Sequence, residues 1–249
     1  MGRLLLAALT LATLLAGGCD WNQQSSWFPL TEGMTWRYRT ELTKRKQTVD
    51  SVYRVLGPLT LPQIGREGIA VEEHRSTRPT AWNGPDEVEL SVWITDGDWM
   101  NRVYLQYDGK ELVPQIGFED RKILPVHLRA GMSWESTTIA IGEAEDGGYA
   151  HRHRLERETA PIVVPAGTFR DCLRLETESV VKAPGEGTEP GDQEIVYLYR
   201  EWYAPKVGLV RMESWGDRER TDERSKTELV EFGTVAATPT ERSEAEGKP

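Results

Sequence analysis

Two histidines in the second half of the chain have the spacing of a possible metal-binding pair. His151 and His153 are two residues apart, so on a strand both imidazole rings would lie on one face. A metal needs a third ligand and usually a fourth, and Glu143, Glu145 and Asp146 are the nearest candidates in sequence. An exposed, charged strand accounts for the same residues. We therefore predict neither a metal nor a cofactor.

Cys172 is a second residue that could do chemistry, since a thiolate is a strong nucleophile. In a predicted strand, Phe169, Leu173 and Leu175 would share one face and Cys172 would lie on the other. A reactive thiol is one interpretation. No His or Lys neighbours Cys172 in sequence, so we favour a small packed residue inside the sheet.

The chain lacks the usual catalytic signatures. It has no Gly-rich phosphate loop, no G-x-S-x-G elbow and no H-E-x-x-H pair. Carboxylates are abundant, but their abundance does not indicate a catalytic pair. The mixed charge runs over 152–158 and 217–228 are typical of solvated surfaces. We predict that the protein is not an enzyme.

The N-terminus carries the most specific signal. Arg3 precedes an apolar run over residues 4–15, which is shorter than the roughly 20 residues of a membrane-spanning helix. Small residues then lead through Gly18 to Cys19. This segment resembles the lipobox of bacterial lipoproteins, although Ala16 stands where Leu is usual. The resemblance implies cleavage between Gly18 and Cys19 and attachment of diacylglycerol to the Cys19 sulfur. An ordinary secretory signal with a coincidental cysteine is the alternative.

Acylation of Cys19 would decide where the protein resides. Each buried methylene contributes about 0.8 kcal/mol, so two or three acyl chains, such as palmitate, hold a protein firmly at a membrane. We expect a lipid anchor at the periplasmic face of a membrane in the cell envelope. Asp20 resembles the inner-membrane retention signal of enteric bacteria, but the choice between inner and outer membrane stays open.

The charge of the chain excludes some partners. Its 40 acidic residues outnumber 30 basic ones, which gives a net charge of −10. Nucleic acids bind basic surfaces, so we predict no nucleic-acid partner. We expect the membrane to be engaged through the acyl chains on Cys19.

Short runs of alternating polarity between Gly and Pro turns predict an all-β protein. A hairpin over 195–203 and 209–214, with its turn at 204–208, is the clearest element, and Asp96-Gly97 marks another hairpin turn. We expect a curved antiparallel sheet, either a sandwich or half-barrel-like. The predicted strands are 36–43, 47–56, 68–74, 87–95, 99–106, 133–141, 150–159, 169–182, 195–203, 209–214 and 226–232.

The order of motifs predicts two pseudo-repeat halves. The segment from Pro29 to Trp36 is matched by the segment from Val126 to Trp134, each with a Gly-Met-(Thr/Ser)-Trp ending. The predicted organisation is a signal peptide over 1–18, a lipidated tether over 19–26, a β domain over 27–232 and a disordered tail over 233–249. The halves of the domain would be 27–120 and 121–232.

Two further motifs carry a resemblance. One is V-P-A-G-T-F-R-D-C, ending at Cys172, and the other is W-Y-A-P-K-V-G-L-V, which begins at Trp202. Together with the opening P-L-x-x-G-x-x-W motif, they resemble an uncharacterised family of bacterial envelope lipoproteins. The resemblance implies a curved antiparallel β fold over about 27–232 and no activity, because the motifs mark turns and core residues.

Two functional hypotheses follow. The first is a non-catalytic binding or assembly module, in which loop aromatics such as Trp82 and Trp99 meet an envelope protein or glycan. The second is a carrier of lipid or another apolar ligand in a cavity of the curved sheet. The same large side chains could instead simply fill the core, which would leave no room for a ligand.

Overall fold

The computed structural model describes residues 27–78, 87–108, 111–114, 122–139, 148–183 and 193–234. Gly18, Cys19, Trp82 and the acidic residues over 143–146 lie outside these ranges. Every helix or strand assigned within the described ranges is a strand, which confirms the predicted all-β class. No helix there has the length and apolar character that crossing a membrane would require.

The strands cover most of the described residues. They are β1 (Met34–Leu42), β2 (Gln47–Leu61), β3 (Arg66–Arg78), β4 (Glu87–Asp96), β5 (Trp99–Asp108), β6 (Glu111–Pro114), β7 (Lys122–Pro125), β8 (Ser133–Ile139), β9 (Gly148–Arg157), β10 (Ile162–Val164), β11 (Gly167–Phe169), β12 (Leu173–Ala183), β13 (Gln193–Ala204), β14 (Gly208–Trp215) and β15 (Glu223–Thr234). Hairpins connect most of them, as the Gly and Pro turns predict.

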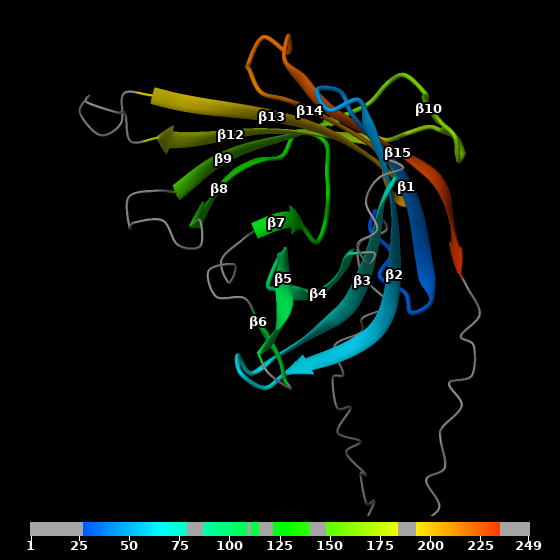
Figure 1. The fold of residues 1–249 in the computed structure, drawn as a ribbon, viewed down its shortest axis with the longest axis vertical. Coiled ribbons are helices and arrows are strands. Elements are labelled where there is room, and N and C mark those ends of the chain that lie inside the picture. The colour runs from blue at the N-terminus through cyan, green and yellow to red at the C-terminus, as the bar shows by residue number, and fades with distance from the viewer. Residues whose placement is uncertain are drawn as a thin grey trace, which may run out of the picture.

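Thirteen of the described strands form one antiparallel sheet in the order β6-β5-β4-β3-β2-β1-β15-β14-β13-β12-β9-β8, with β7 beside β5. Two groups of sequential strands meet in this order. We call β1–β7 the first wing and β8, β9 and β12–β15 the second wing. Pairing of β1 with β15 joins them, from Met34↔Thr234 to Leu42↔Ser225. The first and last strands of the chain therefore lie side by side in the middle of the sheet (Figure 1).

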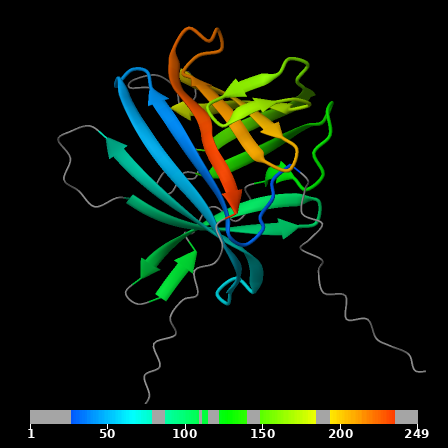
Figure 2. The ribbon, with the colours of Figure 1, turned by 90° about the vertical axis from the view of Figure 1, so that its right-hand side faces the viewer.

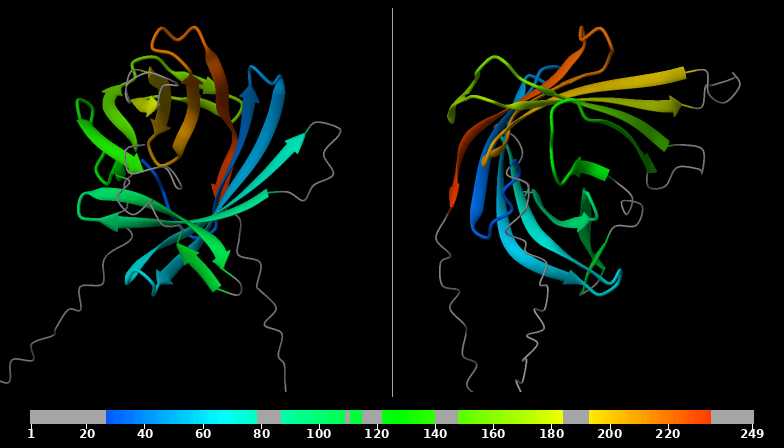
Figure 3. Two further views of the ribbon diagram at one scale, coloured as in Figure 1. Left: turned by 60° about the vertical axis from the view of Figure 1, so that its left-hand side comes forward. Right: turned by 180° about the vertical axis from the view of Figure 1, so that it is seen from behind.

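Irregular pairing bends the sheet. Bulges interrupt the register between Arg37 and Tyr38 of β1 and between Val55 and Gly57 of β2. A bulge places an extra residue on one strand and increases its bend and twist. Gly57 adopts a φ of +110°, which a residue with a side chain rarely adopts. The two wings consequently diverge from the β1–β15 junction and leave a concave face between them (Figures 2 and 3).

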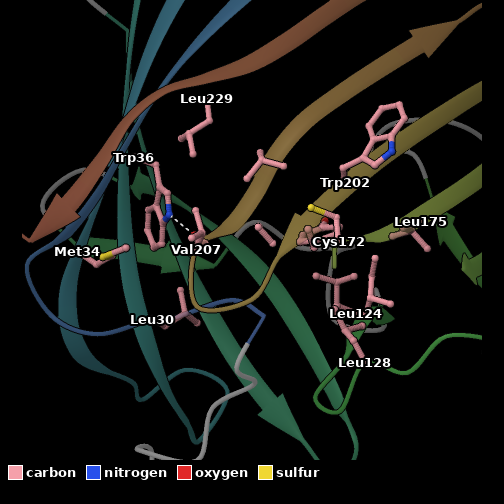
Figure 4. Close-up of a cluster of buried hydrophobic side chains, with 14 of the residues drawn as sticks. Leu30, Met34, Trp36, Leu124, Leu128, Cys172, Leu175, Trp202, Val207 and Leu229 are labelled. Atoms are coloured by element: carbon pink, nitrogen blue, oxygen red, sulfur yellow. Dashed lines mark hydrogen bonds between the residues drawn. The ribbon is translucent and has the colours of Figure 1, made fainter. Parts of the chain in front are cut away.

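The main core lies at this junction. Trp36 of β1 is 3% exposed, and its indole Nε1 donates a hydrogen bond of 2.6 Å to the carbonyl of Val207, in the β13–β14 turn (Figure 4). Leu30 from the segment before β1 packs in the same cluster, together with Met34 of β1 and Leu229 of β15. One continuous cluster thus links both wings and the residues that precede β1.

Several sequence predictions are confirmed in detail. The turn at 204–208 joins β13 to β14, and Asp96-Gly97 begins the turn between β4 and β5, where Gly97 has a φ of +58°. The sheet is a single curved layer and not two sheets packed face to face, so the half-barrel-like alternative holds and the sandwich does not. The pseudo-repeat halves over 27–120 and 121–232 stay a prediction.

Several predicted strand boundaries are wrong: β3 and β15 are longer than expected, and β6, β7 and β10 were not predicted. Two of the differences have a clear physical reason. The second strand was expected to end at residue 56, before Gly57-Pro58, but β2 continues to Leu61, because a bulge at Leu56 lets Gly57 pair with Ala70. The strand expected over 169–182 is also divided. Phe169 ends β11, the chain turns at Asp171 with a φ of +55°, and β12 begins at Leu173. The short β10–β11 hairpin instead packs outside β14 and β15, where the backbone N–H of Ala166 donates to the carbonyl of Leu229.

Gly68 in β3 permits a close approach of β4. A Cβ atom added at Gly68 would lie 2.5 Å from the carbonyl oxygen of Trp93 and 2.5 Å from Cγ1 of Val92. We predict that Gly68→Ala lowers the free energy of unfolding by about 1–3 kcal/mol, because the β4 backbone must move to admit the methyl group. Urea denaturation measures this change, provided that the dependence of the free energy of unfolding on urea concentration (the m-value) is the same in both proteins.

Gly233→Ala is the matched control. A Cβ atom at Gly233 would meet no heavy atom within 4 Å, so this variant is expected to stay within about 0.5 kcal/mol of the wild type. Equal midpoints for the two variants would show that the β3–β4 contact does not require glycine.

Candidate functional site

A cavity of about 890 Å³ occupies the concave face of the sheet and is partly open to solvent. Its lining comes from both wings, so it exists only because β1 and β15 bring them together. Small-molecule sites usually have volumes of about 300–1,000 Å³. The cavity is therefore large enough for a ligand, and the side chains of the core do not fill it.

Strand alternation determines which side chains face this cavity. In β2, Val49, Ser51 and Tyr53 point inward, whereas Val52 points outward and is 37% exposed. In β13, the alternate residues from Tyr197 to Tyr203 point inward. The inward-facing residues are therefore separated in sequence by residues of the outer face.

The base of the cavity is apolar and largely aromatic. The ring of Phe28 stacks on Trp36, with centroids 5.8 Å apart, and contacts Trp93 at 4.8 Å. Phe28 belongs to the segment before β1, while Trp36 and Trp93 come from two strands of the first wing. Leu30, Val71, Leu175 and Leu209 extend this apolar surface. It offers contact area to hydrocarbon and little to a strongly hydrated ligand.

A buried ion cluster lies in the first wing. Glu73 is 2% exposed, and one of its carboxylate oxygens lies 2.5 Å from Nε of Arg75. Nη2 of Arg102 lies 3.5 Å from the other oxygen, and Glu89 contacts both guanidinium groups at 3.5 and 3.7 Å. Burial, followed by the charge of Glu73, raises the pKa of Tyr53. The cluster thus pairs two carboxylates with two guanidinium groups, and Tyr53 keeps its proton.

Aromatic rings also hold Arg102 in place. Its guanidinium carbon lies 4.4 Å from the ring centroid of Tyr104 and 5.7 Å from that of Trp93. Cation–π contacts of this kind orient a guanidinium group and reduce its need for water. Arg102 is consequently a fixed part of the cavity wall.

The two histidines line the second wing of the cavity. Nδ1 of His151 lies 2.7 Å from Oγ of Ser179, and Nδ1 of His153 lies 2.9 Å from Oγ1 of Thr177. Nε2 of His153 also lies 2.9 Å from Oγ of Ser136. These contacts place uncharged hydroxyl groups around both imidazole rings.

The expectation of an exposed charged strand is wrong for His151, which is buried. Residues of β9 alternate, so Arg152 and Arg154 point outward while the histidines face the cavity. Within the described ranges, no group of three or more His, Cys, Asp or Glu residues could hold a metal ion. The candidate ligands over 143–146 lie outside those ranges.

Tyrosines are concentrated at the cavity. Six of the eight tyrosines in the chain line it, namely Tyr38, Tyr53, Tyr104, Tyr197, Tyr199 and Tyr203. Burial raises the pKa values of Tyr38 and Tyr203, with a further contribution from nearby Glu201. The hydroxyl of Tyr203 donates to Glu201 at 3.2 Å, and that of Tyr38 donates to the carbonyl of Leu209 at 2.9 Å. Such rings combine apolar area with a neutral polar group.

Cys172 lies away from this cavity. It is fully buried, and burial, followed by the charges of Glu158 and Asp171, raises its pKa to about 11. The packed interpretation is confirmed, although Cys172 lies in the turn before β12 and not within a strand. Trp99, named as a partner-binding aromatic, contacts Trp134 at 5.7 Å and so connects β5 with β8.

Sequence reasoning missed most of the cavity. Neither Glu73 nor Arg102 is predicted from the sequence, because the contact between them joins β3 to β5, and the sequence does not reveal the register of these strands. A signal was present in β13, where Tyr197, Tyr199, Glu201 and Tyr203 occupy alternate positions. Polar aromatic residues on one strand face indicate a semi-polar interior, not a closed core.

Comparisons with known proteins add two structural similarities. No family model matches the chain, and no curated protein matches it. The crystal structure of a lipoprotein predicted in Parabacteroides distasonis ATCC 8503 covers 84% of this chain and 99% of its own, at 19% identity and a TM-score of 0.45. An exported protein predicted in Bacteroides fragilis NCTC 9343, described as having a YmcC-like fold, has the same coverage, 15% identity and a TM-score of 0.40. Both scores are below 0.5, so neither residue roles nor activity are transferred to this chain.

The raised pKa of Cys172 predicts low thiol reactivity. At pH 8, a pKa of about 11 in place of 9 lowers the thiolate fraction about 100-fold, and burial blocks access further. Iodoacetamide is therefore expected to leave Cys172 of the folded protein unmodified and to alkylate it in guanidinium chloride, as measured by the mass of the peptide that contains Cys172. Rapid alkylation of the folded protein would contradict the packed, inert role.

Proposed function

We propose that this protein is a bacterial envelope lipoprotein that is held at the periplasmic face of a membrane by acyl chains on Cys19. Its role is non-catalytic: it binds a ligand with a substantial apolar part in the cavity of the curved sheet. The observation that carries the proposal is the 890 Å³ cavity with its aromatic base. This observation favours the carrier hypothesis over the interpretation in which the aromatic residues only fill a core.

The chemistry of the cavity supports this choice. Phe28, Trp36 and Trp93 offer a continuous apolar surface, and burying hydrocarbon on it contributes about 25 cal/mol per Å² removed from water. Polar groups also line the cavity, and one of them, the guanidinium group of Arg102, lies 5.7 Å from the ring centroid of Trp93. Sites for small apolar ligands combine these two properties, with a few polar groups that fix the orientation of the ligand.

The edges of the described sheet give less support to a protein-assembly role. One edge is β6, which has four residues and ends in Pro114. The other is β8, where Glu135 is exposed and within 3.5 Å of Arg152 of β9. Short strands, proline and charge all discourage the addition of a partner strand. Recognition of an envelope protein or glycan through loops is a second proposal, for which the described residues offer no comparable observation.

Blocking the cavity tests ligand binding. Ser51 faces the cavity from β2 and is 7% exposed, so Ser51→Phe places a ring where the ligand would lie. We expect the protein purified from envelopes to carry at least about fivefold less bound small molecule than the wild type, as measured by mass spectrometry of its solvent extract per mole of protein.

Val52→Phe is the control, because Val52 is the next residue of the same strand and points to the outer face. It should retain the wild-type amount of ligand. Equal ligand content in the two variants, or none in the wild type, would refute binding in the cavity.

Acylation of Cys19 is tested separately. The wild type should incorporate labelled palmitate and sediment with membranes, since two or three acyl chains bind firmly. A variant with an ordinary secretory signal and Cys19→Ala should lose both properties and appear in the soluble periplasmic fraction. Cys172→Ser serves as the control and should keep the label, because Cys172 is buried in the fold. A wild-type protein without label would overturn the proposed anchor.

A further inference from the structure

Three of the four charged side chains that line the cavity compensate one another. Glu73 and Glu201 are the carboxylates of the lining, and Arg75 and Arg102 are its guanidinium groups. Glu73 has both guanidinium groups within 3.5 Å. An anionic ligand would have to compete with Glu73 for the arginines, and a cationic ligand would have to compete with the arginines for Glu73.

Glu201 adds a reason against an anionic ligand. It projects into the cavity from β13, accepts a hydrogen bond from the hydroxyl of Tyr203, and lies opposite Leu175 in the register with β12. A carboxylate or phosphate placed beside it would be repelled in a partly desolvated site, where such repulsion is poorly screened.

Strands β8, β9 and β12 of the second wing bring hydroxyl and imidazole groups to the cavity. Ser136, Thr177 and Ser179 bring hydroxyl groups beside the imidazole rings of His151 and His153. A hydroxyl can donate and accept, and a neutral imidazole does both through its two nitrogens. Hydrogen bonds within this network can be replaced by hydrogen bonds to the hydroxyl groups of a ligand. The replacement leaves no buried charge without a partner.

We propose that the ligand is an uncharged amphiphile, a hydrocarbon chain with a hydroxyl-bearing head such as glycerol or a sugar. The head lies against the hydroxyl and imidazole groups of β9 and β12, and the chain lies on Phe28, Trp36 and Trp93. This inference rests on the proposed function, which requires only that the ligand has an apolar part. It adds the class of the head group and makes Glu201 a residue that determines specificity.

Three photoreactive probes with the same oleoyl chain test the proposal. Their heads are glycerol, a carboxylate and an ammonium group. Each probe is added to isolated membranes that contain the full-length protein and is activated by light, and the labelled fraction is measured by mass spectrometry. Labelling of Ser51→Phe is subtracted as background. We expect the glycerol probe to label cavity peptides at least about tenfold more than either charged probe.

The outcomes separate the two proposals. Equal or stronger labelling by a charged probe overturns the uncharged head and leaves apolar ligand binding intact. If none of the three probes labels the wild type above the Ser51→Phe background, the proposed function itself fails.

Glu201→Gln tests the specificity role, because it removes the charge and keeps the shape of the side chain. It should raise labelling by the carboxylate probe several-fold relative to the glycerol probe. Glu213→Gln is the control, since Glu213 lies on the neighbouring strand outside the cavity lining and should leave the ratio unchanged. An unchanged ratio in Glu201→Gln would contradict the role of Glu201.

Discussion

Pairing of β1 with β15 is the constraint on which the rest of the structure depends. These strands lie about 190 residues apart in sequence, yet they pair along the whole of β1. Two side-chain hydrogen bonds from β1 reinforce the pairing. The indole of Trp36 donates to the carbonyl of Val207, and the hydroxyl of Tyr38 donates to the carbonyl of Leu209. Both carbonyls belong to the β13–β14 hairpin, so β1 is tied to the second wing by its side chains as well as its backbone. Contacts this distant in sequence slow folding, because the loop must close before they form.

The β1–β15 pairing joins two wings that diverge, and the resulting curvature of the sheet explains which residues line its concave face. A flat sheet would expose that face, and a closed core would require it to be apolar. A concave, partly open face lies between these limits, and its lining accordingly combines apolar side chains with tyrosine, serine, threonine and histidine. Their polar groups bond to one another, as in the contacts of Thr40 with Thr227 and of His151 with Ser179, both under 3 Å. The cavity is thereby kept open by satisfied polar groups instead of being filled by larger apolar ones.

Local signals predicted the local structure. Asp96-Gly97 and the turn around Gly208 specify hairpins through backbone conformations that glycine permits, and both were located correctly. The ion cluster of Glu73 with Arg102 and the burial of His151 depend instead on cross-strand register and on the bend of the sheet. Gly57-Pro58 suggested an end to β2, because a bulge and a strand end have the same residue preferences.

The most direct measurement is a crystal structure of the protein purified from its native cells without delipidation. We predict continuous elongated density along Phe28, Trp36 and Trp93, ending within hydrogen-bonding distance of the hydroxyl and imidazole groups of β9 and β12. A cavity occupied by ordered water alone, or one collapsed so that Trp93 and Tyr199 meet across it, would contradict the account.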